Sequence, residues 1–247
     1  MRRVGNRRHP SSTPMLTVPL RLAAEAALVA AMLFGAAGTL AWGRAWALLG
    51  VLLAVRGVGA YVAHRVNPRL VRDRTRLPLH RDQPTIDRVL VLGVLATGFL
   101  GIPLVAARDV FRWHLLPAPP SWLSGVGLVA FAAGWALKSR ALRDNAFAVG
   151  EVRPQHVEAQ AVADAGVYAV VRHPFYAADP LIHVGLALWL GSSFAALAAA
   201  APVALMLVRL RLEERFLARE LPGYAGYMRR VRFRPVPGIW WATQRVV

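Results

Sequence analysis

GVYAVVRHPFY, residues 166–176, lies between two long apolar runs and combines a glycine, two tyrosines, an arginine, a histidine and a proline. Arg172 and His173 stand where the sequence turns apolar, and a charged group beside a membrane segment is costly unless it has a partner. The stretch therefore predicts a functional site at the end of a membrane helix. A plainer interpretation is also open, in which Pro174 only breaks a helix and the two polar side chains reach for the lipid headgroups.

A second polar pair, Glu213-Glu214, follows the next apolar run and favours the interpretation as a site. Neighbouring residues on a helix point about 100° apart, so the two carboxylates are not expected to do the same job. The polar stretch 141–165 also gathers acidic residues directly before the arginine motif. This clustering predicts a site assembled on the cytosolic side.

The composition is that of a membrane protein. Of the 247 residues 56% are hydrophobic, and the mean hydropathy is +0.42, which is too apolar for an ordinary soluble domain. The net charge of +17 arises from basic residues placed between the apolar runs, which the positive-inside rule explains better than a nucleic-acid partner does. The chain has no cysteine, and its seven histidines show no ligand spacing, so no metal site is expected.

The apolar runs predict an all-α, polytopic membrane bundle of about five spans, the last two forming a helical hairpin. The first four spans are expected over residues 16–42, 45–63, 89–107 and 121–137. Asp179-Pro180 predicts the N-cap and first residue of the next helix. Gly191-Ser192-Ser193 predicts the turn of the hairpin, and Pro202 predicts a kink in its second arm.

Charge between the spans predicts the domain layout and orientation. Residues 1–14 are expected to form a disordered cytoplasmic tail, and residues 15–247 a single integral membrane domain. We expect the N-terminus and the site on the cytoplasmic side of a bacterial plasma membrane, because the external turns hold few basic residues. Arg56 falls inside the second span and needs a partner, for which Glu25 is the candidate.

Two groups of residues resemble the superfamily of isoprenylcysteine carboxyl methyltransferases and phospholipid methyltransferases, which are integral membrane enzymes. The matching residues are Gly166, Tyr168, Arg172-His173-Pro174, Tyr176, Glu213-Glu214, Leu221-Pro222-Gly223-Tyr224, Tyr227 and Arg234, with Asn145 and Phe147 in a preceding element. The resemblance covers about residues 130–241, and its two halves are specific only in combination. The chain departs from the family where Val167 replaces a usual proline and where Ala177 replaces a common glycine.

The resemblance implies a methyltransferase that binds S-adenosylmethionine at the cytosolic ends of the last helices. The acceptor would be small or lipophilic, with a carboxylate, a thiol or a lipid amine, and would enter partly from the bilayer. The implied cofactor-binding residues are Gly166, Tyr168, Arg172, His173, Pro174, Tyr176, Glu213 and Glu214. The implied catalytic residues are Arg172, Glu214, Tyr227 and Arg234.

The chemistry of S-adenosylmethionine suggests individual roles. Arg172 is expected to hold the methionyl carboxylate in a fork, and the ring face of Tyr168 or Tyr176 to attract the sulfonium. Either Glu213 or Glu214 would accept hydrogen bonds from the ribose hydroxyls or the amino group, and the choice between them stays open.

Two other classes of function remain in competition. One is a membrane reductase that uses a nicotinamide, and the other is a non-catalytic membrane scaffold or transporter. Transporters tend to hold charge at the bilayer midplane, whereas this sequence gathers it at one end of the spans, which favours an enzyme. No nucleic-acid partner is expected, and the sequence leaves the acceptor and the oligomeric state open.

Overall fold

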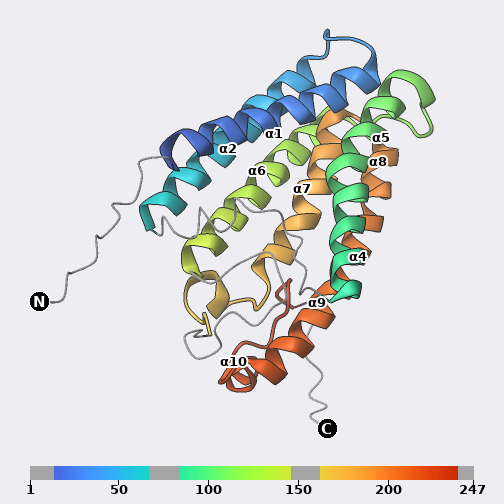
Figure 1. The fold of residues 1–247 in the computed structure, drawn as a ribbon. Helices are drawn as coiled ribbons and strands as arrows, with labels where there is room; N and C mark the ends of the chain where they lie inside the picture. Colours follow the sequence, from blue (N-terminus) through green and yellow to red (C-terminus); the bar gives the residue numbers. More distant parts are fainter. Residues whose placement is uncertain (1–13, 67–83, 146–161, 239–247) are drawn as a thin grey trace, which may run out of the picture.

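The computed structural model describes residues 14–66, 84–145 and 162–238, and all regular elements within these ranges are helices (Figure 1). The predicted all-α bundle is confirmed. In chain order the elements are α1 (Pro14–Ala37), α2 (Gly43–Val66), α4 (Thr85–Val94), η1 (Leu95–Gly101), α5 (Ile102–Arg108), η2 (Asp109–Trp113), α6 (Ser121–Asp144), η4 (Gly166–Ala169), α7 (Pro174–Leu190), α8 (Ser193–Ala198), α9 (Ala200–Glu220) and α10 (Tyr224–Arg230).

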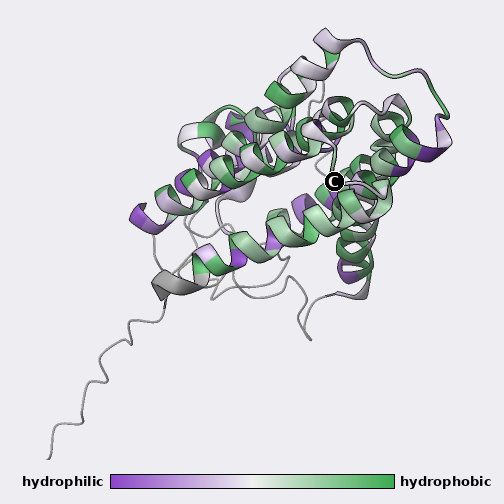
Figure 2. Cartoon of the chain, turned by 90° about the horizontal axis from the view of Figure 1, so that it is seen from above, coloured by the Kyte–Doolittle hydropathy of each residue, from purple (hydrophilic) through white to green (hydrophobic). Residues whose placement is uncertain are grey.

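Four helical segments in the described ranges are long and apolar enough to cross a membrane. They are Val18–Ala37, Gly43–Arg65, Thr85–Trp113 and Ser193–Glu220. The third is a continuous rod of α4, η1, α5 and η2, and the fourth joins α8 to α9. Hydrophobic residues dominate these rods, with polar residues at several helix ends (Figure 2). The helices α6 and α7 complete the bundle, and the expected tail, residues 1–14, falls almost wholly outside the described residues.

The helix ends differ from the expected spans for local reasons. The first helix stops at Ala37, before the expected residue 42, because Gly38 takes a left-handed φ of +75°. The third rod continues past residue 107 to Trp113, where His114 is left-handed at φ +50°. Helix α6 continues past residue 137 to Asp144, since the arginines and lysine of its last turns are good helix formers. The length of an apolar run therefore predicts the segment that can cross the membrane, but not the residues at which its helix begins and ends.

The prediction that Asp179 caps a helix beginning at Pro180 is wrong. Helix α7 begins six residues earlier, with His173 as its N-cap and Pro174 at its first position, and Pro180 lies inside it. Both prolines follow a polar residue, so the local pattern did not separate them. The carboxylate of Asp179 is buried and forms an ion pair with Lys138 of α6.

The helical hairpin is confirmed. Helix α7 ends at Leu190, Gly191 has a φ of +97°, and the Ser192 hydroxyl accepts a hydrogen bond from the Ala195 amide at 2.9 Å. The second arm is interrupted at Ala199, between α8 and α9. This break lies just before Pro202, whose ring removes an amide from the helical ladder.

The helices α6 and α7 pack with their backbones in close approach. A Cβ on Gly127 would lie 2.8 Å from the Gly185 carbonyl oxygen, and one on Gly185 would lie 2.6 Å from that of Gly127. One on Gly134 would lie 2.9 Å from the Ala178 carbonyl oxygen. Small residues permit such contact between membrane helices. This glycine seam fixes α7, and with it the first turn that carries residues 174–176.

Candidate functional site

Backbone hydrogen bonds tie the arginine motif to the segment that follows α10. The Arg172 amide donates to the Phe233 carbonyl at 3.0 Å, and the His173 amide donates to the Arg234 carbonyl at 3.2 Å. The Tyr227 hydroxyl donates to the Tyr168 carbonyl at 2.8 Å. Hydrogen bonds within the protein itself therefore join segments about 60 residues apart in the chain.

The Arg172 guanidinium is buried and clamps Glu214. Its Nε and Nη2 donate to Glu214 Oε1 at 2.8 and 2.6 Å, and its Nη1 donates to the carbonyls of Val231 and Arg232 at 2.6 and 3.1 Å. These four bonds take most of the donors that a guanidinium offers. Glu214 Oε2 lies 2.7 Å from Arg234 Nε. Arg172 and Glu214 thus bind each other, and both also contact the segment that follows α10.

His173 approaches the same carboxylate, with its Nε2 3.5 Å from Glu214 Oε1. This nitrogen is buried and has no hydrogen-bond partner among the described residues. The ring packs edge-on against Tyr176, with the centroids 5.8 Å apart.

Glu213 belongs to a separate cluster. It accepts a hydrogen bond from the Tyr176 hydroxyl, which itself accepts one from Arg209 Nη1 at 2.9 Å. Arg209 Nε donates to Asp87 Oδ1 of α4 at 2.8 Å. The two adjacent glutamates therefore do different work, as their angular separation on α9 predicts. The Glu213 side chain is 27% exposed and that of Glu214 only 6%, so Glu213 is the more accessible to a ligand.

Gly166 has a different local role from the predicted one. Its φ is +60°, and an added Cβ would overlap the carboxylate of Asp144. That carboxylate accepts hydrogen bonds from the Val167 amide at 3.0 Å and from Arg140 Nε at 3.1 Å. Burial raises the pKa of Asp144, but these bonds and that from Arg143 outweigh it, so the pKa lies below its ordinary value. The freedom of Gly166 thus serves the junction with α6, and its contact with a cofactor stays a prediction.

Tyr224, which was quoted in the motif but given no role, is the main residue that the sequence reasoning missed. It is buried at 3% exposure, and its hydroxyl has no hydrogen-bond partner among the described residues. Burial, and then the negative charges of Glu214 and Glu213, raise its pKa well above the ordinary value. Its phenol therefore stays protonated at neutral pH and is a donor available to a ligand.

Arg209 and Asp87 were also missed. The spacing of Arg209 four residues before Glu213 gave a signal for the first. Asp87 lies in the first turn of another helix, and nothing in its local sequence connects it to the site.

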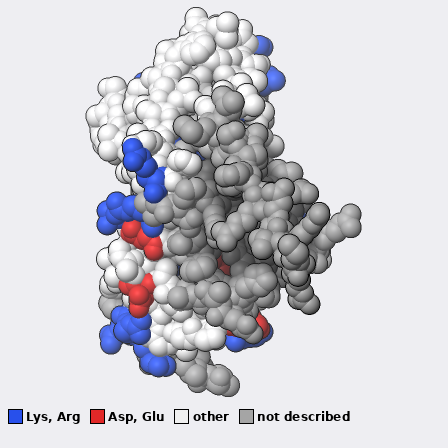
Figure 3. Space-filling model, turned by 60° about the vertical axis from the view of Figure 1, so that its left-hand side comes forward, with Lys and Arg blue, Asp and Glu red and all other residues white. Residues whose placement is uncertain are grey.

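The structure brings most of the predicted residues to one end of the bundle. Pro174 begins α7, and Asn145 follows the last residue of α6, whereas Phe147 lies outside the described residues. In Figure 3 most charged side chains of the visible face lie in the lower half, and the upper part is mainly uncharged. The lower half is the end at which α10 lies in Figure 1.

Comparisons with known proteins agree with this arrangement. Residues 122–222 match the family model described as phospholipid methyltransferase. The solved structure of a eukaryotic intramembrane Ras methyltransferase, ICMT (isoprenylcysteine carboxyl methyltransferase), is similar in fold, with a TM-score of 0.51 and 19% sequence identity. The similarity covers 88% of this chain and 75% of that one. Among curated proteins, none matches the sequence significantly.

The resemblance drawn from the motifs is thereby confirmed, and the chain is an integral membrane protein. The family match begins near the start of α6 and ends just before α10, so it contains both the arginine motif and the paired glutamates. The structural likeness extends the shared fold to the earlier helices.

Proposed function

We propose that the chain is an S-adenosylmethionine-dependent methyltransferase of the membrane that acts on a small or lipophilic acceptor. The observation that carries the proposal is the meeting of Arg172 and the paired glutamates at one end of the bundle. The match of residues 122–222 to phospholipid methyltransferases supports the reaction class. The acceptor group would be a carboxylate, a thiol or a lipid amine.

The unpaired polar groups fit such a cofactor. S-adenosylmethionine carries ribose hydroxyls, an amino-acid end and a sulfonium, and its bound form supplies an electrophilic methyl group. We assign Glu213 to its hydroxyl or amino groups, because that carboxylate is accessible. The Tyr224 hydroxyl and His173 Nε2 are buried without a hydrogen-bond partner among the described residues. Buried polar groups are normally hydrogen-bonded, so these two favour a polar ligand.

Arg172 takes a modified role in this proposal. Its donors are directed to Glu214 and to two carbonyls, so we assign it and Glu214 to positioning rather than to the methionyl carboxylate. Tyr227 acts in the same way through its bond to the Tyr168 carbonyl. Arg234, which holds the other oxygen of Glu214, is 20% exposed and is the candidate to face an anionic acceptor.

Methyl transfer is an in-line displacement, in which positioning supplies much of the rate. A carboxylate or thiolate attacks without losing a proton, whereas an ammonium must first be deprotonated. The phenol of Tyr224 has a raised pKa and is therefore a hydrogen-bond donor rather than a general base at neutral pH. This arrangement fits best an acceptor that is already an anion. The site and the N-terminus would face the cytoplasm of a bacterial cell.

Calorimetric titration of the detergent-solubilised protein with S-adenosylhomocysteine and, separately, with NADPH tests the proposal. We expect the first to bind and the second not to, and Glu213→Gln to weaken binding about tenfold through loss of a charge-assisted hydrogen bond. The matched control is Glu220→Gln, an exposed glutamate on the same helix. Binding of NADPH alone would favour a reductase, and binding of neither would favour a non-catalytic protein.

The acceptor is sought by comparing methylated lipids, by mass spectrometry, in cells with and without the protein. Loss of one methylated species on Glu213→Gln would connect it to the site.

A further inference from the structure

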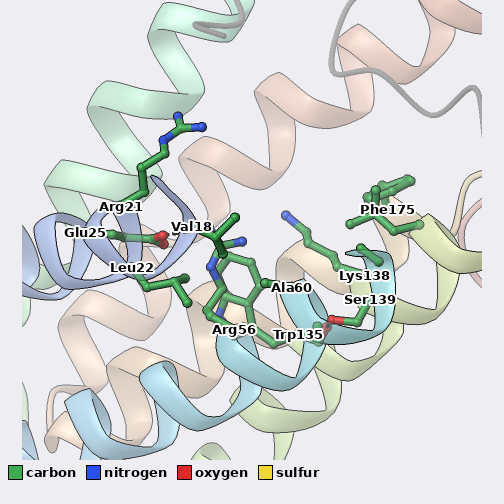
Figure 4. Close-up of a pocket in the computed structure, with 13 residues that line it drawn as sticks. Val18, Arg21, Leu22, Glu25, Arg56, Ala60, Trp135, Lys138, Ser139 and Phe175 are labelled. Atoms are coloured by element: carbon green, nitrogen blue, oxygen red, sulfur yellow. Dashed lines mark hydrogen bonds and ion pairs between the residues drawn. The ribbon is translucent and has the colours of Figure 1, made fainter. Parts of the chain in front are cut away.

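A second polar assembly lies in a cavity of about 290 Å³ formed by α1, α2 and α6 and reaching Phe175 in the first turn of α7. Its charged lining residues are Arg21, Glu25, Arg56 and Lys138. Figure 4 shows Glu25, Arg56 and Lys138 converging around Trp135, with Arg21 at one edge. None of the residues assigned above to cofactor or acceptor lines this cavity.

Two hydrogen-bond donors of this cavity are unused. Arg56 Nε and Trp135 Nε1 are both buried atoms without a hydrogen-bond partner among the described residues. Arg56 is nevertheless held firmly, since its Nη2 lies 2.6 Å from Glu25 Oε2 and its guanidinium carbon 4.4 Å from the centre of the Trp135 ring. A buried donor without an acceptor is destabilising. Neither donor has an acceptor among the described residues, although the Glu25 carboxylate lines the same cavity, so both donors are available to an electron-rich ligand.

The charges of the cavity also fail to balance. Arg21, Arg56 and Lys138 are cationic, whereas Glu25 pairs with Arg56 and Asp179 pairs with Lys138, which leaves one positive charge in excess among the described residues. The charge in excess is that of Arg21, which is exposed near the start of the candidate span Val18–Ala37. An anion would cancel it.

The surroundings favour an anion attached to a lipid. The remaining wall of the cavity is largely apolar, with Val18, Leu22, Ala60, Ala63 and Leu142. A second cavity of about 370 Å³ shares Gly59 and Ser139 with the first and is lined mainly by alanine and valine of α2 and α6. Apolar surface therefore adjoins the charged chamber. A soluble anion would gain no favourable contact with that apolar surface, whereas an acyl chain would be buried against it.

We infer that the cavity between α1, α2 and α6 binds the anionic headgroup of a membrane lipid through Arg56 and Trp135. Arginine matches phosphate or carboxylate oxygens in a planar fork, and the indole N–H donates to the same group. Arg21 supplies the uncompensated charge at the edge. The site goes beyond the proposed transferase function, since it requires neither cofactor nor turnover.

Native mass spectrometry of the intact protein tests the inference by measuring bound lipid with three probes. These are dioleoylphosphatidylglycerol, dioleoylphosphatidylcholine with the same chains, and glycerol phosphate as the free anion. We expect the phosphatidylglycerol to bind at least tenfold more tightly than either of the others. Equal binding of the two lipids would overturn the inference, and so would tight binding of glycerol phosphate, which would show a site for a soluble anion.

Two variants locate the site. Arg56→Gln should weaken binding of the phosphatidylglycerol about tenfold, and Trp135→Phe, which removes the indole N–H and leaves a smaller aromatic ring, about threefold. The control is Arg215→Gln, an equal change of charge at an exposed position on α9, which should change nothing. If Arg56→Gln fails to fold, Trp135→Phe decides the question, because it keeps an aromatic ring beneath the guanidinium of Arg56. Undiminished binding in folded variants would overturn the inference.

S-adenosylhomocysteine binding separates this site from the candidate cofactor site. Its affinity should be the same in Trp135→Phe as in the wild type. A failure of the cofactor proposal would appear in the calorimetry of Glu213→Gln and would leave the lipid measurement untouched.

Discussion

The two polar assemblies of this protein differ in how their charges are matched. At the arginine motif, three arginines face three carboxylates. Arg172 and Arg234 pair with Glu214, and Arg209 pairs with Asp87 and Glu213. In the chamber between α1, α2 and α6, three cations face two carboxylates. Among the described residues, the first assembly is balanced in charge, and its unused groups are the hydrogen-bonding atoms of Tyr224 and His173. The second has one cation more than it has carboxylates. The comparison teaches that the two proposed sites would favour ligands of different charge.

The largest test removes one carboxylate from each assembly. Glu214→Ala leaves Arg172 buried without a counter-charge and should lower the free energy of unfolding by about 3–5 kcal/mol. Glu25→Ala should cost about 1 kcal/mol, because the Arg56 side chain is 35% exposed and keeps its contact with Trp135. Chemical denaturation in detergent measures both. Equal losses of unfolding free energy in the two variants would contradict the proposed difference between the two assemblies.

The next test concerns the junction that supports the first assembly. Gly166→Ala introduces a left-handed alanine and a clash with Asp144, and should cost about 2 kcal/mol in unfolding free energy. Gly125→Ala on α6, where an added Cβ meets nothing within 4 Å, is the control and should not destabilise the protein. A Gly166→Ala protein as stable as the wild type would contradict the described junction.

Removing the unused donor of the first assembly tests whether that donor serves a ligand. Tyr224→Phe should leave stability unchanged or slightly raised, because its hydroxyl has no partner among the described residues, and should weaken S-adenosylhomocysteine binding about fivefold. Calorimetry and thermal unfolding measure the two effects. A loss of stability without any loss of affinity would show that the hydroxyl is structural.

The smallest expected effect is a dependence on pH. Because the pKa of Asp144 is lowered in the folded state, its contribution to stability is present above the ordinary value of 3.8 and disappears as the pH falls through the folded value. The difference in unfolding free energy between wild type and Asp144→Asn should therefore shrink as the pH falls from about 5 toward 3. A difference that is constant over this range would contradict the assigned ion pairs.

Pattern alone predicted the bundle and the meeting of its two motifs. Long apolar runs identified the four candidate spans, whereas the expected span at residues 121–137 is not among them. Gly191 with Ser192 identified the hairpin turn. The partner of Arg56 was also correctly predicted as Glu25, because a charge inside a span requires one. These features depend on composition or on residues close in the helix.

The failures depend on tertiary contacts. Asp179 has the local pattern of an N-cap, but its carboxylate pairs with Lys138 on another helix. The pairing of Arg172 with Glu214, which lies 42 residues further along the chain, was not predicted. Asp87 joins the site only because α4 packs against α9. The spacing of residues along one helix could not predict these contacts between different helices.

The glycine seam between α6 and α7 has a mechanical consequence. The backbones of α6 and α7 approach closely at Gly127 and Gly185, which leaves little room for the two helices to slide past each other. This rigid pair carries Trp135 of the cavity between α1, α2 and α6 on one helix, and Tyr176, which donates to Glu213, on the other.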